Sequence, residues 1–361
     1  MARRPANRKL GARTTDRKPL RTANRELGIR ASVQAALLKW YGSSARDLPW
    51  RRTKDPYAIW VSEIMLQQTR VATVIPYFER FLAALPSIEA LATADEDTLH
   101  RLWKGLGYYR RAALLKKGAQ HVMVEHGGTL PPDPAALAAI PGFGPYTAGA
   151  VGSIAFKLPV PAVDGNVVRV FSRWFNDATP ADALRVRLQA GEAAAWVAAE
   201  DPGSWSQALM ELGATVCTPR NPRCEVCPVE SYCAGAKAGT AGGLPVKGKE
   251  GKHVVLPVFV AVYRQKATVW LEKRPAGGLL AGLWGFPMPV KRPGVKSHEV
   301  LRYKHVFTHR TWEAGVFEVP GKPPEGSGGK WVSLEDLVHE AIPTAFQPVV
   351  RYLTEKDLFA R

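Results

Sequence analysis

The sequence predicts two domains of different class, an all-α domain followed by an α+β domain. From about residue 31 to residue 216, apolar residues recur at helical spacing with short connections and almost no strand pattern. From residue 254 onward, short runs of β-branched and aromatic residues alternate with turns. All four cysteines lie between these regions, within residues 217–233. A chain of 361 residues is long enough for two such cores.

Caps and glycines mark the helix boundaries in the first region. Asp55-Pro56 is an N-cap followed by proline at the first helical position, so a helix is expected through about Gln67. A further helix is expected over residues 93–103, where a Gly-Leu-Gly sequence ends it, and another follows. We therefore expect a helical domain over residues 31–233.

The second region begins after a stretch rich in glycine, lysine and alanine. This stretch, residues 234–253, is expected to be a linker. Ser333, followed three residues later by Asp336, is expected to cap a helix. Residues 254–361 are therefore expected to form the α+β domain, with strands over residues 254–263, 267–271 and 311–319.

The charge balance indicates a polyanionic partner. Lys and Arg number 49 against 32 Asp and Glu, which gives a net charge of +17. Residues 1–30 are rich in arginine and poor in acids and large apolar residues, so we expect a disordered basic tail there. An organelle transit peptide has a similar composition. No membrane span is expected, because the longest uncharged run, residues 134–156, is interrupted by Pro-Gly-Phe-Gly-Pro.

The cysteine spacing predicts a metal centre. Cys217, Cys224, Cys227 and Cys233 have the pattern C-x6-C-x2-C-x5-C, which lets one compact loop surround a single centre. Disulfides are the alternative, but they are typical of small secreted domains, and no secretory signal is evident. Zinc favours paired C-x2-C knuckles, whereas the uneven spacing favours an iron–sulfur cluster.

A Gly-x-Gly sequence between two apolar helices predicts an anion site. In residues 137–148, Gly142 and Gly144 allow backbone amides at the start of the second helix to point outward, as in a helix–hairpin–helix that grips a DNA phosphate. The alternative is a tight turn packed by glycines. About twenty residues later, Asp164 stands among apolar residues, where a carboxylate is costly unless it is hydrogen-bonded or functional.

The hairpin at residues 135–155, the aspartate and the cysteine motif, in this order, resemble the iron–sulfur DNA glycosylases of the endonuclease III superfamily. Within it, residues 62–69, Leu48-Pro49-Trp50 and residues 105–109 resemble the MutY-type adenine glycosylases. The lyases of the superfamily carry a Schiff-base lysine at the position of Tyr146, so strand cleavage through that position is not expected.

The resemblance implies a [4Fe-4S] cluster on the four cysteines and roles for individual residues. Glu63 would be the acid that protonates adenine, and Asp164 would stabilise or attack the sugar, positioned by Tyr146 and Asn166. Without the resemblance, an exposed helix glutamate and a capping aspartate are the preferred interpretations. Trp50, Arg46 and Gln207 would line the adenine pocket. The residues that would wedge into the duplex, or lie beside the wedge, are Gln68, Tyr108, Leu66 and Thr69.

The C-terminal region resembles the MutT-like (Nudix-fold) domain of that family. Residues 271–275, residues 282–287 and Phe307-Thr308-His309 carry the resemblance, and the last implies a loop that contacts 8-oxoguanine. The family has serine where this chain has Thr308, and threonine keeps the hydroxyl. Residues 289–304 contain Glu299 as their only glutamate, so no metal-dependent pyrophosphatase is expected.

The sequence thus predicts a monomeric, monofunctional adenine glycosylase acting on double-stranded DNA that holds adenine opposite 8-oxoguanine or guanine. We expect a cytoplasmic, nucleoid-associated protein, or an organellar or nuclear one in a eukaryotic cell, and its protein partners stay open. A thymine-mismatch glycosylase shares the cluster and the hairpin tyrosine. An iron–sulfur redox sensor explains the charge and the cysteines but gives Glu63 and Asp164 no role.

Overall fold

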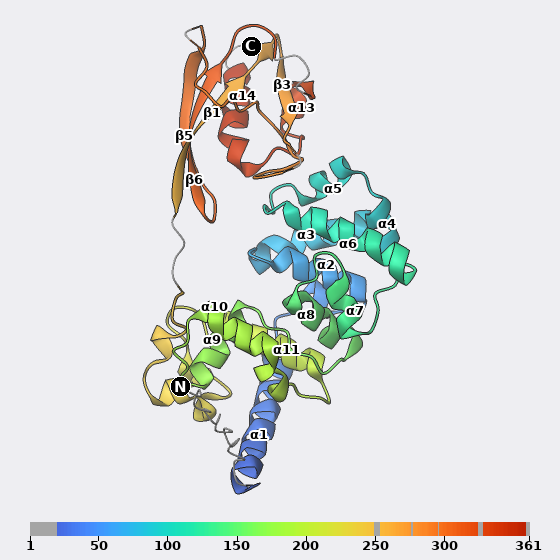
Figure 1. Ribbon diagram of the computed structural model, residues 1–361, viewed down its shortest axis with the longest axis vertical. Coiled ribbons are helices and arrows are strands. Elements are labelled where there is room, and N and C mark those ends of the chain that lie inside the picture. Colours follow the sequence, from blue (N-terminus) through green and yellow to red (C-terminus); the bar gives the residue numbers. More distant parts are fainter. Residues whose placement is uncertain (1–19, 249–252, 276, 295, 324–327, 359–361) are drawn as a thin grey trace, which may run out of the picture.

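The computed structural model describes residues 20–248, 253–275, 277–294, 296–323 and 328–358. It has a helical domain with two lobes and a strand-rich C-terminal domain (Figure 1). This arrangement confirms the predicted fold class. In the part of the chain that the structure describes, no helix has the length and apolar character needed to cross a membrane.

The first helical lobe surrounds a core of large aromatic side chains. Trp60, Phe81 and Trp103 are completely buried in it. Asp55 caps its first helix as expected, accepting hydrogen bonds from the amides of Tyr57 and Ala58. The helices of this lobe are α2 (Pro56–Leu66), α3 (Val71–Ala84), α4 (Ile88–Thr93), α5 (Glu96–Trp103), α6 (Arg110–His126), α7 (Pro134–Ala139) and α8 (Pro145–Phe156).

The expected single helix over residues 93–103 is wrong at its start. The chain forms α4 and α5 instead, and Ala94 and Asp95 lie between them. The Asp95 side chain accepts a 2.7 Å hydrogen bond from the Thr98 amide. An aspartate that bonds to the backbone in this way favours a helix start over a helix interior.

The second helical lobe has a separate core, which includes Leu37, Phe171, Trp205 and Leu212. Its helices are α1 (Leu20–Ser44), α9 (Gly165–Trp174), α10 (Ala181–Arg187), α11 (Pro202–Thr215) and α12 (Ala234–Lys237). Because α1 begins at Leu20, the expectation of a disordered tail through residue 30 is corrected for residues 20–30. Residues 1–19 lie outside the described residues.

The first part of the expected linker is folded against the second lobe. Gly235 is buried so closely on α9 that an added Cβ atom would lie 2.6 Å from the carbonyl oxygen of Arg173. Leu244 is buried too, and its carbonyl oxygen accepts a 2.9 Å hydrogen bond from Arg173. The linker between the domains therefore begins later than residue 234.

The C-terminal domain contains two small sheets with helix α14 (Gln347–Leu358) beside them (Figure 1). In one sheet β6 (Arg310–Glu318) lies between β1 (Val254–Val262), which is parallel to it, and β5 (His298–Val306), which is antiparallel. In the other, β3 (Thr268–Lys273) pairs with β2 (Arg264–Gln265), β4 (Trp284–Gly285) and β7 (Gly329–Ser333). Ser333 caps α13 (Leu334–Leu337) as predicted.

The C-terminal domain contacts the first helical lobe near α5. Leu283 is fully buried and belongs to the core cluster of that lobe. Lys273 of β3 forms a 2.8 Å ion pair with Glu96, and the Trp284 indole donates a 3.4 Å hydrogen bond to Asp97. These contacts set where the β5–β6 turn lies relative to the helical domain.

Candidate active site and cluster loop

Glu63 lies in the middle of α2, a helix that is buried almost along its whole length. Only 5% of its surface is exposed, so the interpretation as an exposed helix glutamate is wrong. The hydroxyl of Tyr146, on α8, donates a short hydrogen bond to Glu63 Oε2. Packing of α2 against α8 therefore brings together two residues 83 positions apart in the chain.

Burial gives the Glu63 carboxyl an unusual acidity. It raises the pKa from 4.5 to about 7, the Tyr146 hydrogen bond opposes the shift, and the nearby Asp164 charge adds to it. A carboxyl group with such a pKa holds its proton in a substantial fraction of molecules near neutral pH. Burial and the same two carboxyl groups also raise the pKa of Tyr146 well above 10, so its hydroxyl stays a donor.

Asp164 is both a helix cap and a member of the carboxylate pair. Its Oδ1 accepts a 2.8 Å hydrogen bond from the Val167 amide at the start of α9, and its Oδ2 accepts a 2.7 Å bond from Asn166 Nδ2. Burial raises the pKa of Asp164, and these hydrogen bonds oppose that rise. The cap interpretation is thus correct as geometry, and it leaves the carboxylate near Glu63.

The structure corrects one expected pairing. Asn166 does hold Asp164, but the Tyr146 hydroxyl bonds to Glu63 instead of Asp164. Asn166 is held in turn by Arg169, whose Nη2 donates a 2.7 Å bond to Asn166 Oδ1 and whose Nε donates a 2.7 Å bond to the Cys217 carbonyl. A chain of hydrogen bonds therefore joins Asp164 to the cysteine loop.

The three expected pocket residues have different surroundings. Trp50 is buried and packs edge-on against Phe78, with ring centroids 5.5 Å apart. Gln207 lies on α11 and donates a 3.3 Å hydrogen bond to the Gly203 carbonyl. Arg46 forms a bidentate pair with Glu211, with both distances at 2.7 Å.

Glu211 and Arg51 were not singled out in the sequence. Arg51 Nη2 lies 2.8 Å from Glu211 Oε2, and Arg51 also lowers the pKa of Glu63 slightly. Burial of Glu211 is outweighed by its hydrogen bonds from Arg46 and Arg51, so its pKa falls to about 2. No spacing rule joins residues 160 positions apart, and only the packing of α11 reveals this triad.

The two hairpin glycines lie directly before α8. Gly142 has a φ of +88°, in the region that favours glycine, and Gly144 precedes α8 without any side-chain cap. An added Cβ atom at Gly144 would meet nothing within 4 Å. Gly144 therefore leaves open space at the start of α8, where Pro145 has no amide hydrogen and Tyr146 carries the first one.

The residues expected to wedge into the duplex or to contact 8-oxoguanine lie at turns of the chain. Gln68 is exposed just after α2, and Tyr108 is 49% exposed just before α6. Thr308 and His309 lie in the β5–β6 turn, while Phe307 packs on Trp312. The Tyr108 hydroxyl and Thr308 Oγ1 are 3.0 Å apart, so the two expected DNA-contacting elements meet across the domain boundary.

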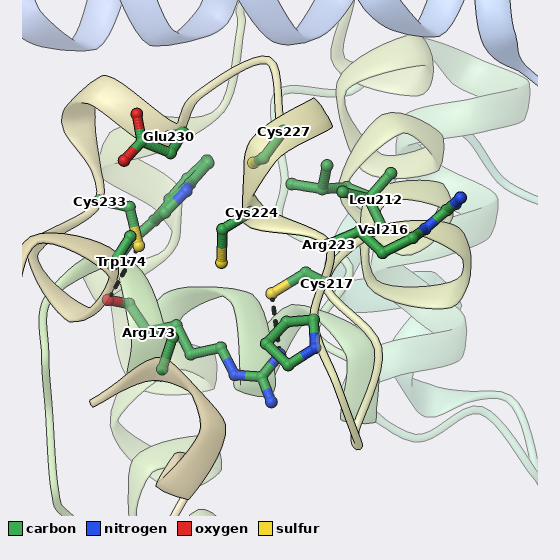
Figure 2. A pocket seen from close by; sticks show the side chains of 13 residues that line it. Arg173, Trp174, Leu212, Val216, Cys217, Arg223, Cys224, Cys227, Glu230 and Cys233 are labelled. Atoms are coloured by element: carbon green, nitrogen blue, oxygen red, sulfur yellow. Dashed lines mark hydrogen bonds between the residues drawn. The ribbon is translucent and has the colours of Figure 1, made fainter. Parts of the chain in front are cut away.

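The four cysteines line a cavity in the loop after α11, in which η4 (Cys224–Val226) and η5 (Glu230–Tyr232) are short turns (Figure 2). Among the described residues, no three His, Cys, Asp or Glu side chains are placed to hold a single metal ion. Four thiols around one cavity fit a multi-iron cluster, in which each thiolate binds a different iron. Buried Arg173 points Nη1 at Cys217 Sγ, 3.2 Å away, which suits an anionic cluster.

Three family models match the chain. A model for HhH-GPD superfamily base excision DNA repair proteins matches residues 61–192. The iron–sulfur binding domain of endonuclease III matches residues 217–233, and the NUDIX domain matches residues 258–352. The [4Fe-4S] cluster implied by the family resemblance is thereby confirmed as the cofactor of this loop.

Several known proteins of similar sequence are adenine DNA glycosylases. An adenine DNA glycosylase of Homo sapiens is 34% identical, covering 91% of this chain and 75% of its own. One of Schizosaccharomyces pombe is 32% identical, covering 84% and 85%. A solved thermostable thymine-DNA glycosylase is similar over 59% of this chain and 99% of its own, at 29% identity with a TM-score of 0.55. An endonuclease III–DNA complex, 21% identical with a TM-score of 0.50 over 59% of this chain and 97% of its own, shares the fold.

Proposed function

The chain belongs to the adenine DNA glycosylase family, and from that membership we propose that it removes adenine mispaired with 8-oxoguanine or guanine in double-stranded DNA. The reaction hydrolyses the N-glycosidic bond and leaves an abasic site. The observation that carries this proposal is the buried Glu63, hydrogen-bonded to Tyr146, with Asp164 close enough to raise its pKa.

Glu63 supplies the proton in the proposed mechanism. Adenine is a poor leaving group as an anion, and a proton on its N7 makes it a neutral one. With a pKa of about 7, the Glu63 carboxyl holds a proton near neutral pH and releases it more readily than an ordinary alcohol or amide. After the base departs, the Glu63 carboxylate accepts a proton from the attacking water.

Asp164 acts on the sugar. Loss of the base leaves positive charge on C1′ and the ring oxygen, and an anion beside it lowers the energy of that state. The Val167 amide and Asn166 hold the Asp164 carboxylate in place. In this mechanism the N-glycosidic bond breaks between a protonated Glu63 and an ionised Asp164.

The enzyme is proposed to be monofunctional. A lyase needs an amine that forms a Schiff base with C1′, and Tyr146 occupies the hairpin position at which the lyases carry it. The Tyr146 hydroxyl is engaged by Glu63 and remains protonated. Strand breaks therefore appear only after treatment with alkali.

The C-terminal domain is proposed to read the base opposite adenine without hydrolysing nucleotides. Thr308 and His309 lie at an exposed turn. The Thr308 hydroxyl contacts the Tyr108 hydroxyl of the helical domain. Glu299 is paired with Arg292, at 3.0 Å, and with Arg302, which leaves no free carboxylate cluster for a divalent ion in this described segment.

The test is single-turnover cleavage of duplexes that hold adenine opposite 8-oxoguanine, guanine, cytosine or thymine, with and without alkali. Excision is expected to be fastest opposite 8-oxoguanine, and breaks are expected only with alkali. Glu63→Gln should abolish excision while duplex binding stays within a few-fold of the unmodified enzyme.

A duplex with thymine opposite guanine is the decisive control, because a thymine-DNA glycosylase shares the fold of the helical domain. Removal of thymine with adenine left intact in every duplex would replace the proposed function by thymine excision. Breaks without alkali would remove the monofunctional assignment alone.

A further inference from the structure

Arg111 is a buried cation beneath the two turns that carry Gln68 and Tyr108. It lies in the first turn of α6, is 9% exposed, and has its guanidinium carbon 5.5 Å from the centre of the Trp103 ring. In the described part of the chain, every hydrogen-bond acceptor of Arg111 is a neutral oxygen. A buried charge without a carboxylate partner is costly, so its geometry calls for an explanation.

The guanidinium holds two separate segments. Nη1 donates to the carbonyl oxygens of Ile64, at 3.0 Å, and Met65, at 2.9 Å, and also to that of Gln67. These carbonyls belong to the end of α2 and the turn that follows it. Nη1 therefore fixes the segment that leads into Gln68.

Nη2 reaches the other segment. It donates to the carbonyl oxygens of Leu106 and Gly107, each at 3.2 Å, and to Thr69 Oγ1 at 3.1 Å. The two carbonyls directly precede Tyr108, and Thr69 directly follows Gln68. One planar group thus ties together two turns that are about forty residues apart in the sequence.

Both turn residues adopt a backbone conformation that needs such support. Gln68 has a φ of +60° and Tyr108 a φ of +48°. Both values lie in the left-handed region that residues other than glycine rarely adopt. Conformations of this kind persist only where the surrounding structure imposes them. Both residues are exposed, and the Tyr108 ring centre lies 5.4 Å from the Arg111 guanidinium carbon, so Arg111 supports these turns by hydrogen bonds and by stacking on Tyr108.

We propose that Arg111 is a positioning residue that holds Gln68 and Tyr108 at a fixed separation, so that both enter the duplex together when the target base is extruded. The inference rests on the proposed function, since a base must leave the stack before it is excised. Lysine cannot replace Arg111, because an ammonium lacks the planar fork that reaches two segments at once.

The test measures extrusion separately from excision. A duplex carries 2-aminopurine in place of the target adenine, opposite 8-oxoguanine, and its fluorescence rises when the base leaves the stack. In the Glu63→Gln background, adding Arg111→Lys should remove most of the rise at saturating enzyme. Arg110→Lys, at the exposed neighbouring position, should retain it. With Glu63 intact, Arg111→Lys should slow excision by about 100-fold, the scale of a misplacement near 1 Å.

A second substrate distinguishes positioning from stability. An adenine in a single-base bulge has no partner and costs less to extrude. If Arg111 positions the wedge, the ratio of variant to unmodified rate is closer to one on the bulge than on the paired duplex. Thr69→Val, which removes only one acceptor, should shift both readouts in the same direction by less.

Equal losses on both substrates, or an unchanged fluorescence rise, would overturn the role of Arg111. The fluorescence experiment needs no excision, so it still judges Arg111 if the unmodified enzyme fails to remove adenine. That failure would count against the proposed function instead.

Discussion

Burial alone changes what Glu63 can do. On a solvent-facing helix its carboxyl would titrate near 4.5, but in α2 its pKa is about 7 because water is excluded from the carboxylate. The Tyr146 hydroxyl keeps the group hydrogen-bonded in either protonation state. The acid required by the proposed chemistry is therefore a property of the site and not of the residue type.

Glu63→Gln should change how stability depends on pH. The folded state binds the Glu63 proton more tightly than the unfolded state, so the free energy of unfolding falls as pH rises from about 4.5 to about 7 and is constant above. The variant lacks this loss, so its stability relative to the unmodified protein should rise across that window, by about 3 kcal/mol in total. Thermal or urea unfolding at pH 4.5 and pH 8 measures it.

Glu89→Gln, which makes the same change at an exposed position of α4, is the matched control. In the unmodified enzyme, the excision rate should also fall above about pH 7, as Glu63 loses its proton. A stability difference for Glu63→Gln that is the same at both pH values would contradict the raised pKa.

Sequence analysis could not identify residues that act through partners far away in the chain. Glu63 and Asp164 were found through family motifs, but Glu211 and Arg111 were not. Arg111 donates mostly to backbone carbonyl oxygens. Because every residue type has such an oxygen, no sequence pattern predicts the role of Arg111. Arg46 was found, but its carboxylate partner on α11 was not.

Helix α8 shows the importance of close backbone contact at the scale of an element. Gly149 lies so near the segment before Asp164 that an added Cβ atom would be 2.1 Å from the Pro161 carbonyl oxygen. This contact sets the distance between α8, which carries Tyr146, and the segment that leads to Asp164. The apolar residues of α8 predict a buried helix, but not this spacing.

Gly149→Ala should therefore destabilise the protein, by about 1–3 kcal/mol as for other overpacked sites, and slow excision by moving Tyr146. Gly144→Ala, in the same hairpin, is the control. Its φ is −84° and its Cβ would meet nothing within 4 Å, so unfolding should be nearly unchanged. Equal unfolding midpoints for the two variants would show that α8 relaxes away from Pro161.

At the scale of the whole molecule, three contacts set the position of the β5–β6 turn, which carries Thr308 and His309. Leu283 is buried in the core of the first helical lobe, Lys273 pairs with Glu96, and the Tyr108 hydroxyl meets Thr308. The first two lie away from the expected DNA-contacting residues. Under the proposed function, they affect lesion recognition only by positioning the C-terminal domain.

Glu96→Lys replaces the attraction to Lys273 by repulsion. It should reduce the preference for 8-oxoguanine over guanine opposite adenine by about fivefold, which corresponds to the scale of about 1 kcal/mol that an exposed pair contributes. Excision of adenine opposite guanine should change less. Single-turnover rates on the two duplexes measure the preference.

The reversed pair, Glu96→Lys with Lys273→Glu, should restore the preference because the attraction is re-formed. Glu89→Lys, which makes the same charge change at an exposed position of α4, separates this effect from a general gain in DNA affinity. If the double variant remains as impaired as Glu96→Lys, the ion pair does not position the domain.

The sequence by itself determined the fold class, the iron–sulfur loop and the family, because these depend on local periodicity and on spacing within short segments. Asp55 and Ser333 marked helix starts correctly for the same reason. Tertiary structure alone decided that Tyr146 bonds to Glu63, that residues 234–244 fold onto α9, and that Arg111 joins two turns. These outcomes depend on which surfaces pack together, and packing brings together residues whose separation in the chain carries no signal.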